Sequence, residues 1–98
     1  MVEIRWTTQA SRDIESIAQF ISKDSSFYAH LFVLDVLRAA DRLSEFPKSG
    51  RIVPELHDPT VRELILGNYR LVYRLKANAV EMLTVYHGAR LLDPSEFK

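Results

Sequence analysis

The stretch VRELILGNYRLVYRL, residues 61–75, decides how this chain folds. Apolar and polar side chains alternate along both of its arms, which is the pattern of half-buried β-strands. Gly67 and Asn68 stand between the arms, and both residue types tolerate the positive φ angles of a two-residue hairpin turn. The sequence therefore predicts two antiparallel strands, over residues 61–66 and 69–75.

Two further strands are expected, one on each side of this hairpin in the sequence. Ala77 and Asn78 turn the chain again, and residues 80–87 then complete an antiparallel meander. Near the N-terminus, residues 2–6 alternate between apolar and charged side chains, which predicts a short half-buried strand. This first strand is expected to join the edge of the meander or to insert beside its last strand.

Two helices are expected between the first strand and the hairpin. Thr7 or Thr8 can cap the first helix, and residues 24–26 end it and supply a cap for the second. The second helix runs to about Phe46, where Pro47 stops it. The apolar positions recur at helical spacing and are Ala10, Ile14, Ile17, Ala18 and Ile21, then Ala29, Phe32, Val33, Val36, Leu37, Ala40 and Leu43.

The predicted element order is β-α-α-β-β-β, within a single domain covering residues 1–98. The link between the helices is short, so they are expected to form an antiparallel hairpin. Both the hairpin and the sheet must bury an apolar face. The fold class is therefore α+β, with the helical hairpin packed on one face of a mostly antiparallel sheet.

Alternation also divides the side chains of the strands between two faces. Leu71 and Tyr73 are expected to point toward the helices, and Arg70 and Arg74 to point away. Arg62 comes near Arg70 across the hairpin if both lie on the open face. Arginine binds phosphate and carboxylate bidentately. The open face is thus a candidate platform for RNA backbone or an acidic protein segment, or else an ordinary solvated face.

Composition excludes several classes of site. There is no cysteine, so disulfides and thiolate metal sites are impossible, and His30, His57 and His87 lack ligand spacing. No metal or cofactor is expected. The net charge is zero, although residues 61–90 carry five basic and two acidic side chains. Neither a signal peptide nor a membrane span is recognisable, so we expect a cytoplasmic protein with no membrane partner.

Three motifs resemble the RelE/ParE superfamily of toxins from type II toxin–antitoxin systems. They are FPKSGR at residues 46–51, GNYRLVYR at residues 67–74 and VYHGAR at residues 85–90. The resemblance covers nearly the whole chain and agrees with the element order above. It implies a toxin that binds a large cellular machine, takes no small-molecule substrate and is neutralised by a cognate antitoxin protein.

The superfamily has two branches with different targets. ParE-like members inhibit DNA gyrase, whereas RelE-like members cut mRNA on the ribosome. The candidate target-binding residues are Arg62, Arg70, Arg74 and Arg90. For a RelE-like member, the resemblance implies that Arg62, Arg70, His87 and Arg90 serve in catalysis. Proton transfer by the segment near Phe97 is an alternative to His87.

Two departures from the nuclease pattern favour the ParE-like branch. Leu64 stands where RelE commonly has lysine, and Glu96 and Phe97 stand where RelE has its catalytic tyrosine. The zero net charge and the long helical hairpin favour the same branch, since phosphate contacts dominate affinity for RNA.

Leu31 and Leu34 fall outside the apolar stripe of the second helix. A helix with apolar residues beyond one stripe either packs on two sides within its own domain or binds another protein. The candidate antitoxin-binding residues are therefore these two leucines together with Phe27 and Tyr28.

Overall fold

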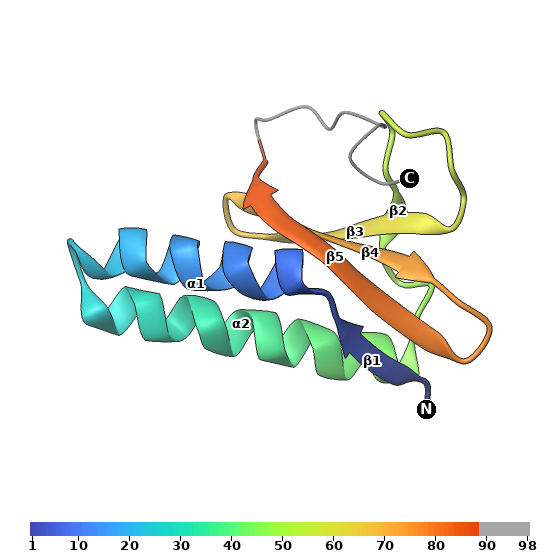
Figure 1. The fold of residues 1–98 in the computed structure, drawn as a ribbon, viewed down its shortest axis with the longest axis horizontal. Coiled ribbons are helices and arrows are strands. Elements are labelled where there is room, and N and C mark those ends of the chain that lie inside the picture. Colours follow the sequence, from blue (N-terminus) through green and yellow to red (C-terminus); the bar gives the residue numbers. More distant parts are fainter. Residues whose placement is uncertain (89–98) are drawn as a thin grey trace.

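The computed structural model describes residues 1–88 and shows two helices against a five-stranded sheet (Figure 1). The elements in chain order are β1 (Glu3–Trp6), α1 (Thr8–Ser22), α2 (Ser26–Glu45), β2 (Arg51–Ile52), β3 (Val61–Leu66), β4 (Tyr69–Leu75) and β5 (Ala79–His87). The expected order and fold class are confirmed. The addition is β2, a two-residue strand inside the long loop.

The sheet has the strand order β1-β5-β4-β3-β2. The three late strands form the expected antiparallel meander, and β2 adds to it antiparallel to β3. β1 pairs in parallel with β5, with Ile4 opposite Val80. The two positions considered for the first strand thus coincide, because the place beside the last strand is also an edge of the sheet.

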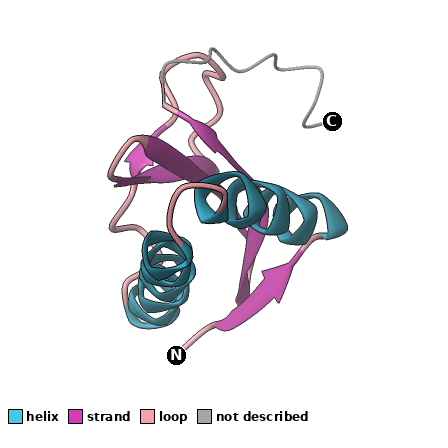
Figure 2. Ribbon diagram, turned by 90° about the vertical axis from the view of Figure 1, so that its left-hand side faces the viewer, coloured by secondary structure: helices cyan, strands magenta, loops and turns pink. Residues whose placement is uncertain are grey.

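The helices form an antiparallel hairpin joined by a short link, which points toward the viewer in Figure 2. Each helix begins at a side-chain cap. The Thr7 hydroxyl accepts a hydrogen bond from the backbone N–H of Ala10 at 3.1 Å, and the Ser25 hydroxyl accepts one from Tyr28 at 3.2 Å. These caps satisfy backbone donors that a helix leaves unpaired at its start.

The main core lies between the helices and one face of the sheet, which we call the helix face. Its buried members are Ala10, Phe32, Val36, Ala39, Leu43, Leu71, Tyr73, Val80, Met82 and Val85. The expectation that Leu71 and Tyr73 point toward the helices is confirmed. The expectation for Leu37 is wrong, because its side chain is 50% exposed while Ala39 is fully buried.

A β-bulge interrupts the pairing of β4 with β5. Val72 pairs with Thr84 and Tyr73 pairs with Met82, so Leu83 is the extra residue. A bulge leaves local backbone groups without their ladder partners and increases the twist of the strand. Other groups must therefore satisfy the backbone of β5 at this point.

The N-cap residue of helix α1 and a residue in its second turn supply those groups. The Thr7 hydroxyl donates to the carbonyl oxygen of Met82 at 2.7 Å. The Asp13 carboxylate accepts from the Thr84 hydroxyl and from the backbone N–H of Val85. The start of α1 is thereby fixed to the bulge in β5.

Within residues 1–88, neither helix combines the length and the apolar character that crossing a membrane requires.

Candidate functional site

The register of the β3–β4 hairpin decides which side chains share a face. Ile65 stands opposite Arg70, and Glu63 stands opposite Val72. Residues directly opposite one another point to the same side of a sheet. Because Val72 packs away from the helical core, these four side chains lie on the other face of the sheet. We call this face the loop face.

The expectation that Arg62 shares a face with Arg70 is wrong. The turn has two residues, so even-numbered residues of β3 stand opposite odd-numbered residues of β4, and Arg62 pairs with Tyr73. From there the Nη1 atom of Arg62 donates to the carbonyl oxygen of Gly50 at 2.9 Å and to that of Lys48 at 3.3 Å. Arg62 therefore holds the loop after α2.

The loop face is also not open. A second apolar cluster, made of Val53, Val61, Val72, Leu83 and Tyr86 with Leu56 beside it, lies there. Val53 and Leu56 belong to the segment 53–60 between β2 and β3, which thereby covers part of this face. The expectation of an exposed arginine platform is corrected accordingly, because Arg70 is only 5% exposed.

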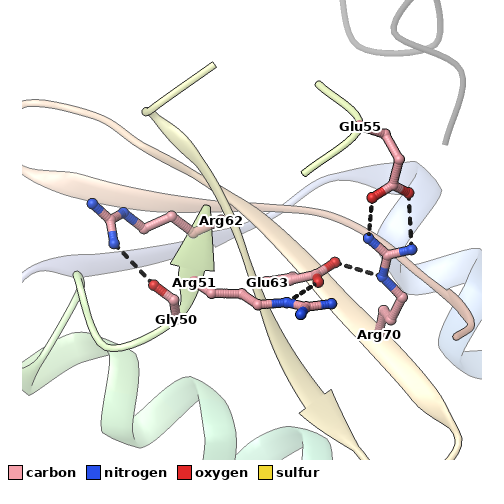
Figure 3. Close-up of polar contacts among 6 residues, drawn as sticks. All are labelled: Gly50, Arg51, Glu55, Arg62, Glu63 and Arg70. Carbon is pink, nitrogen blue, oxygen red and sulfur yellow. Dashed lines mark hydrogen bonds and ion pairs between the residues drawn. The ribbon is translucent and has the colours of Figure 1, made fainter. Parts of the chain in front are cut away.

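Four charged side chains form an ion-pair row along the loop face (Figure 3). The Nε atom of Arg51 donates to Glu63 at 2.6 Å, and the Nε atom of Arg70 donates to the other oxygen of Glu63 at 2.5 Å. The terminal nitrogens of Arg70 donate to both oxygens of Glu55 at 2.9 and 2.8 Å. The Arg51 side chain is 60% exposed, whereas the other three charges are largely buried, which is tolerable because each of them meets an opposite charge.

Arg70 is the centre of this row. Its guanidinium carbon lies 5.1 Å from the centre of the Tyr86 ring, within the range of a cation–π contact. The hydrogen bonds that Arg70 donates to Glu55 and Glu63 raise the pKa of Arg70 and outweigh its burial, which acts in the opposite direction. Arg70 is therefore a permanent cation whose terminal edge and Nε atom are both occupied by carboxylates.

The FPKSGR motif has a structural role at the end of α2. The Tyr73 hydroxyl donates to the carbonyl oxygen of Pro47 at 2.8 Å and accepts from the backbone N–H of Gly50 at 2.9 Å. A Cβ atom on Gly50 would lie 2.6 Å from the carbonyl oxygen of Glu63 and from the Tyr73 hydroxyl. Only glycine fits at this close approach. Burial raises the pKa of Tyr73.

A shallow pocket of about 290 Å³ lies at the end of the sheet that carries the hairpin turn. Arg51, Ile65, Arg70 and His87 contribute to its lining, with turn residues and Gly88 completing it. His87 is exposed and contacts the ring of Tyr69 edge-on at 5.8 Å between centroids. Because His87 stands opposite Tyr69, its side chain lies on the helix face, whereas Arg70 and Ile65 lie on the loop face.

The remaining predicted residues lie elsewhere. Arg74 is on the loop face and forms an ion pair with Glu81 at 3.9 Å. Phe27 and Tyr28 are each 64% exposed at the start of α2, whereas Leu31 and Leu34 are partly buried. Arg90 and Phe97 lie outside the described residues. Among residues 1–88, no group of three or more His, Asp or Glu side chains could hold a metal ion.

Sequence reasoning missed Arg51, Glu55 and Glu63 as members of the site. The signal for Glu63 was available, since the two-residue turn places it diagonally across from Arg70 on one face. No comparable signal existed for Glu55, because its loop has no periodicity that fixes where a side chain points.

Comparisons with known proteins agree with this architecture. The model of the family "ParE toxin of type II toxin-antitoxin system, parDE" matches residues 4–92. A putative toxin, Y4kP of Sinorhizobium fredii, is 41% identical over 87 residues, covering 87% of this chain and 86% of the relative. Toxin RelE2 of Caulobacter vibrioides is 32% identical over 92 residues, covering 93% and 100%.

Two solved structures share the fold. One is the chromosomal ParDE toxin–antitoxin system from P. aeruginosa, with a TM-score of 0.71 and 22% identity over 89% of this chain and 96% of that one. The other is the toxin–antitoxin complex RelBE2 from Mycobacterium tuberculosis, with a TM-score of 0.63 and 24% identity over 91% and 93%. Because the family model matches residues 4–92, the chain belongs to the ParE toxin family of type II toxin–antitoxin systems.

Proposed function

We propose that this toxin inhibits growth by binding DNA gyrase and that a cognate antitoxin protein holds it inactive. Gyrase inhibition is what the resemblance to ParE-like toxins implies, and the match to the ParE family model supports it. The mode of action is binding, so no side chain of the toxin needs to perform covalent chemistry.

The pairing of Arg70 is the observation that carries this choice. A nuclease needs cations aimed at the phosphate, where negative charge develops in the transition state. Here Glu55 and Glu63 occupy three donor positions of Arg70, and Arg62 lies toward the other face. The zero net charge also disfavours binding to RNA.

The test is a supercoiling and DNA-cleavage assay with purified gyrase and purified toxin. We expect loss of supercoiling activity and accumulation of cleaved DNA at micromolar toxin. The same preparation, added to ribosomes programmed with mRNA, is expected to leave the message intact. Cleaved mRNA together with unaffected gyrase would contradict the proposal.

Ribosome-dependent cleavage is the second candidate, and the pocket beside the hairpin turn favours it. Arg51, Arg70 and His87 contribute to its lining, and an imidazole can both accept and donate a proton. In this case His87→Gln should abolish mRNA cleavage while leaving the thermal unfolding curve unchanged, because His87 is exposed. Unchanged cleavage by that variant would remove His87 from the mechanism.

The antitoxin is proposed to cover the start of α2. Phe27, Leu31 and Leu34 are spaced four and three residues apart, which places them on one stripe of the helix. This stripe lies at the end of the helical hairpin that extends past the sheet in Figure 1. An amphipathic antitoxin helix could bury it in the way helices bind apolar grooves.

Phe27→Ser tests the antitoxin surface, with Phe46→Ser as the matched control. The two phenylalanines are 64% and 63% exposed and lie at opposite ends of α2. Loss of an aromatic anchor at an interface weakens binding by about tenfold or more. We expect that loss for Phe27→Ser and near wild-type affinity for Phe46→Ser, measured by calorimetry. Equal affinities for the two variants would place the antitoxin elsewhere.

A further inference from the structure

Glu55 occupies the edge of Arg70 that arginine offers to phosphate groups. Nη1 of Arg70 donates to one carboxylate oxygen of Glu55 at 2.9 Å, and Nη2 donates to the other at 2.8 Å (Figure 3). Two parallel N–H···O bonds of this kind are the geometry in which arginine binds a phosphate bidentately. A phosphodiester that approaches Arg70 must therefore displace Glu55.

The two carboxylates on Arg70 differ in how readily they can leave. The Glu63 side chain is fully buried and is held by Arg51 as well as by Arg70. The Glu55 side chain is 17% exposed and comes from the loop between β2 and β3. Glu63 is thus a buried partner of Arg70 within the sheet. Glu55 lies in a loop and is partly exposed, so a substitution of Glu55 leaves the charges inside the sheet unchanged.

The charges of the ion-pair row balance only while Glu55 is present. Arg51 and Arg70 contribute two positive charges, and Glu55 and Glu63 contribute two negative ones. Without the Glu55 carboxylate, the row carries one net positive charge, and the terminal nitrogens of Arg70 lose their carboxylate acceptor. These nitrogens would then attract anions.

We propose that Glu55 is a specificity-determining residue that excludes nucleic-acid phosphates from the terminal nitrogens of Arg70. It supplies an internal carboxylate in the place that the phosphate would take. This role deepens the proposed function and rests on it, since a ribosome-dependent nuclease would have to admit the phosphate. Glu55 thereby keeps the toxin from binding RNA at this face.

The first experiment compares RNA binding by Glu55→Ala and by the wild type. A short fluorescein-labelled single-stranded RNA is titrated with each toxin at one fixed salt concentration, and fluorescence anisotropy is recorded. We expect Glu55→Ala to bind about tenfold more tightly than the wild type, as the gain of one bidentate arginine–phosphate pair predicts.

Glu45→Ala is the matched control, because Glu45 is exposed at the end of α2 and its loss changes the net charge equally. It is expected to bind RNA as weakly as the wild type. An equal gain by both variants would show a general effect of net charge and overturn the proposal. The gyrase assay is separate, so failure here would leave gyrase inhibition to be judged by its own result.

A second measurement locates the binding. Inorganic phosphate is titrated into 15N-labelled Glu55→Ala while the Nε–H signal of Arg70 is followed by NMR. We expect a saturable shift of this signal, and no such shift in the wild type. Shifts confined to other residues would overturn the proposal.

Glu55→Gln serves if the alanine variant does not fold, which thermal unfolding by circular dichroism will show. It keeps the shape of the side chain and one acceptor for Arg70 while removing the charge. We again expect tighter RNA binding than in the wild type, but with a smaller gain than for Glu55→Ala. A folded glutamine variant with no gain over Glu45→Ala would contradict the role of Glu55.

Discussion

The helices cover one face of the sheet with apolar side chains, whereas the other face is covered by a loop, a smaller apolar cluster and a row of paired charges. Apolar packing is non-directional and follows from the periodicity of the sequence. The ion-pair row depends instead on the placement of individual carboxylates. The two faces should therefore respond differently to the loss of single side chains.

Glu63→Ala is expected to have the largest effect on the loop face. It removes the carboxylate that joins Arg51 and Arg70, and Arg70 is left buried with half of its compensating charge. We expect a loss of about 3 kcal/mol in the free energy of unfolding, since breaking a buried ion pair leaves an uncompensated charge. Urea denaturation measures it. A loss no larger than that of the exposed Glu45→Ala would show that the row contributes nothing to stability.

Leu43→Ala tests the helix face. Leu43 is fully buried in the main core, so its truncation leaves a cavity and should lower the free energy of unfolding by about 2–3 kcal/mol. Leu37→Ala is the control, because Leu37 is half exposed on the same helix and should lose less than about 0.5 kcal/mol. Equal losses in urea denaturation would mean that α2 buries a different stripe.

Tyr73→Phe tests the junction where the two faces meet. The ring stays in the core, but Pro47 loses a donor and the Gly50 N–H loses its acceptor. An unsatisfied buried polar group costs about 1–3 kcal/mol, so we expect a loss near 1–2 kcal/mol in the same assay. An unchanged stability would mean that water replaces the hydroxyl at no cost.

The smallest expected effect is the dependence of stability on alkaline pH. Burial raises the pKa of Tyr73 above its ordinary value of 10.0. As the pH rises past that value, the unfolded chain releases the phenol proton while the folded protein keeps it, so stability falls. The wild type should therefore lose more stability than Tyr73→Phe between pH 9 and 11, a window set by that pKa. Parallel curves for the two proteins would contradict this.

The fold was predictable because each element carries its own signal. The two-residue turn at Gly67 and Asn68 fixed the hairpin, and Pro47 marked the end of α2. Leu37 was misplaced because helical spacing defines a broad stripe, and only the packing against the sheet decides its borders.

The site was predicted only in part. Arg70 was identified and its direction was correct, but its burial was not foreseen, since alternation assigns a side chain to a face without saying what covers it. The loop 53–60 lacks periodicity, so the position of Glu55 could not be derived from sequence. The side of Arg62 could have been derived, because the length of the turn already fixes its partner as Tyr73.

The parallel pairing of β1 with β5 joins segments that are more than seventy residues apart in the sequence. During synthesis β1 therefore cannot pair with β5 until the end of the meander has left the ribosome. The helical hairpin can form earlier, because its contacts are local. Closing so long a loop is slow compared with local folding. Completion of the sheet is thus a late event, and a chain interrupted before residue 79 would hold a helical hairpin that lacks Val80, Met82 and Val85, the core residues that β5 contributes.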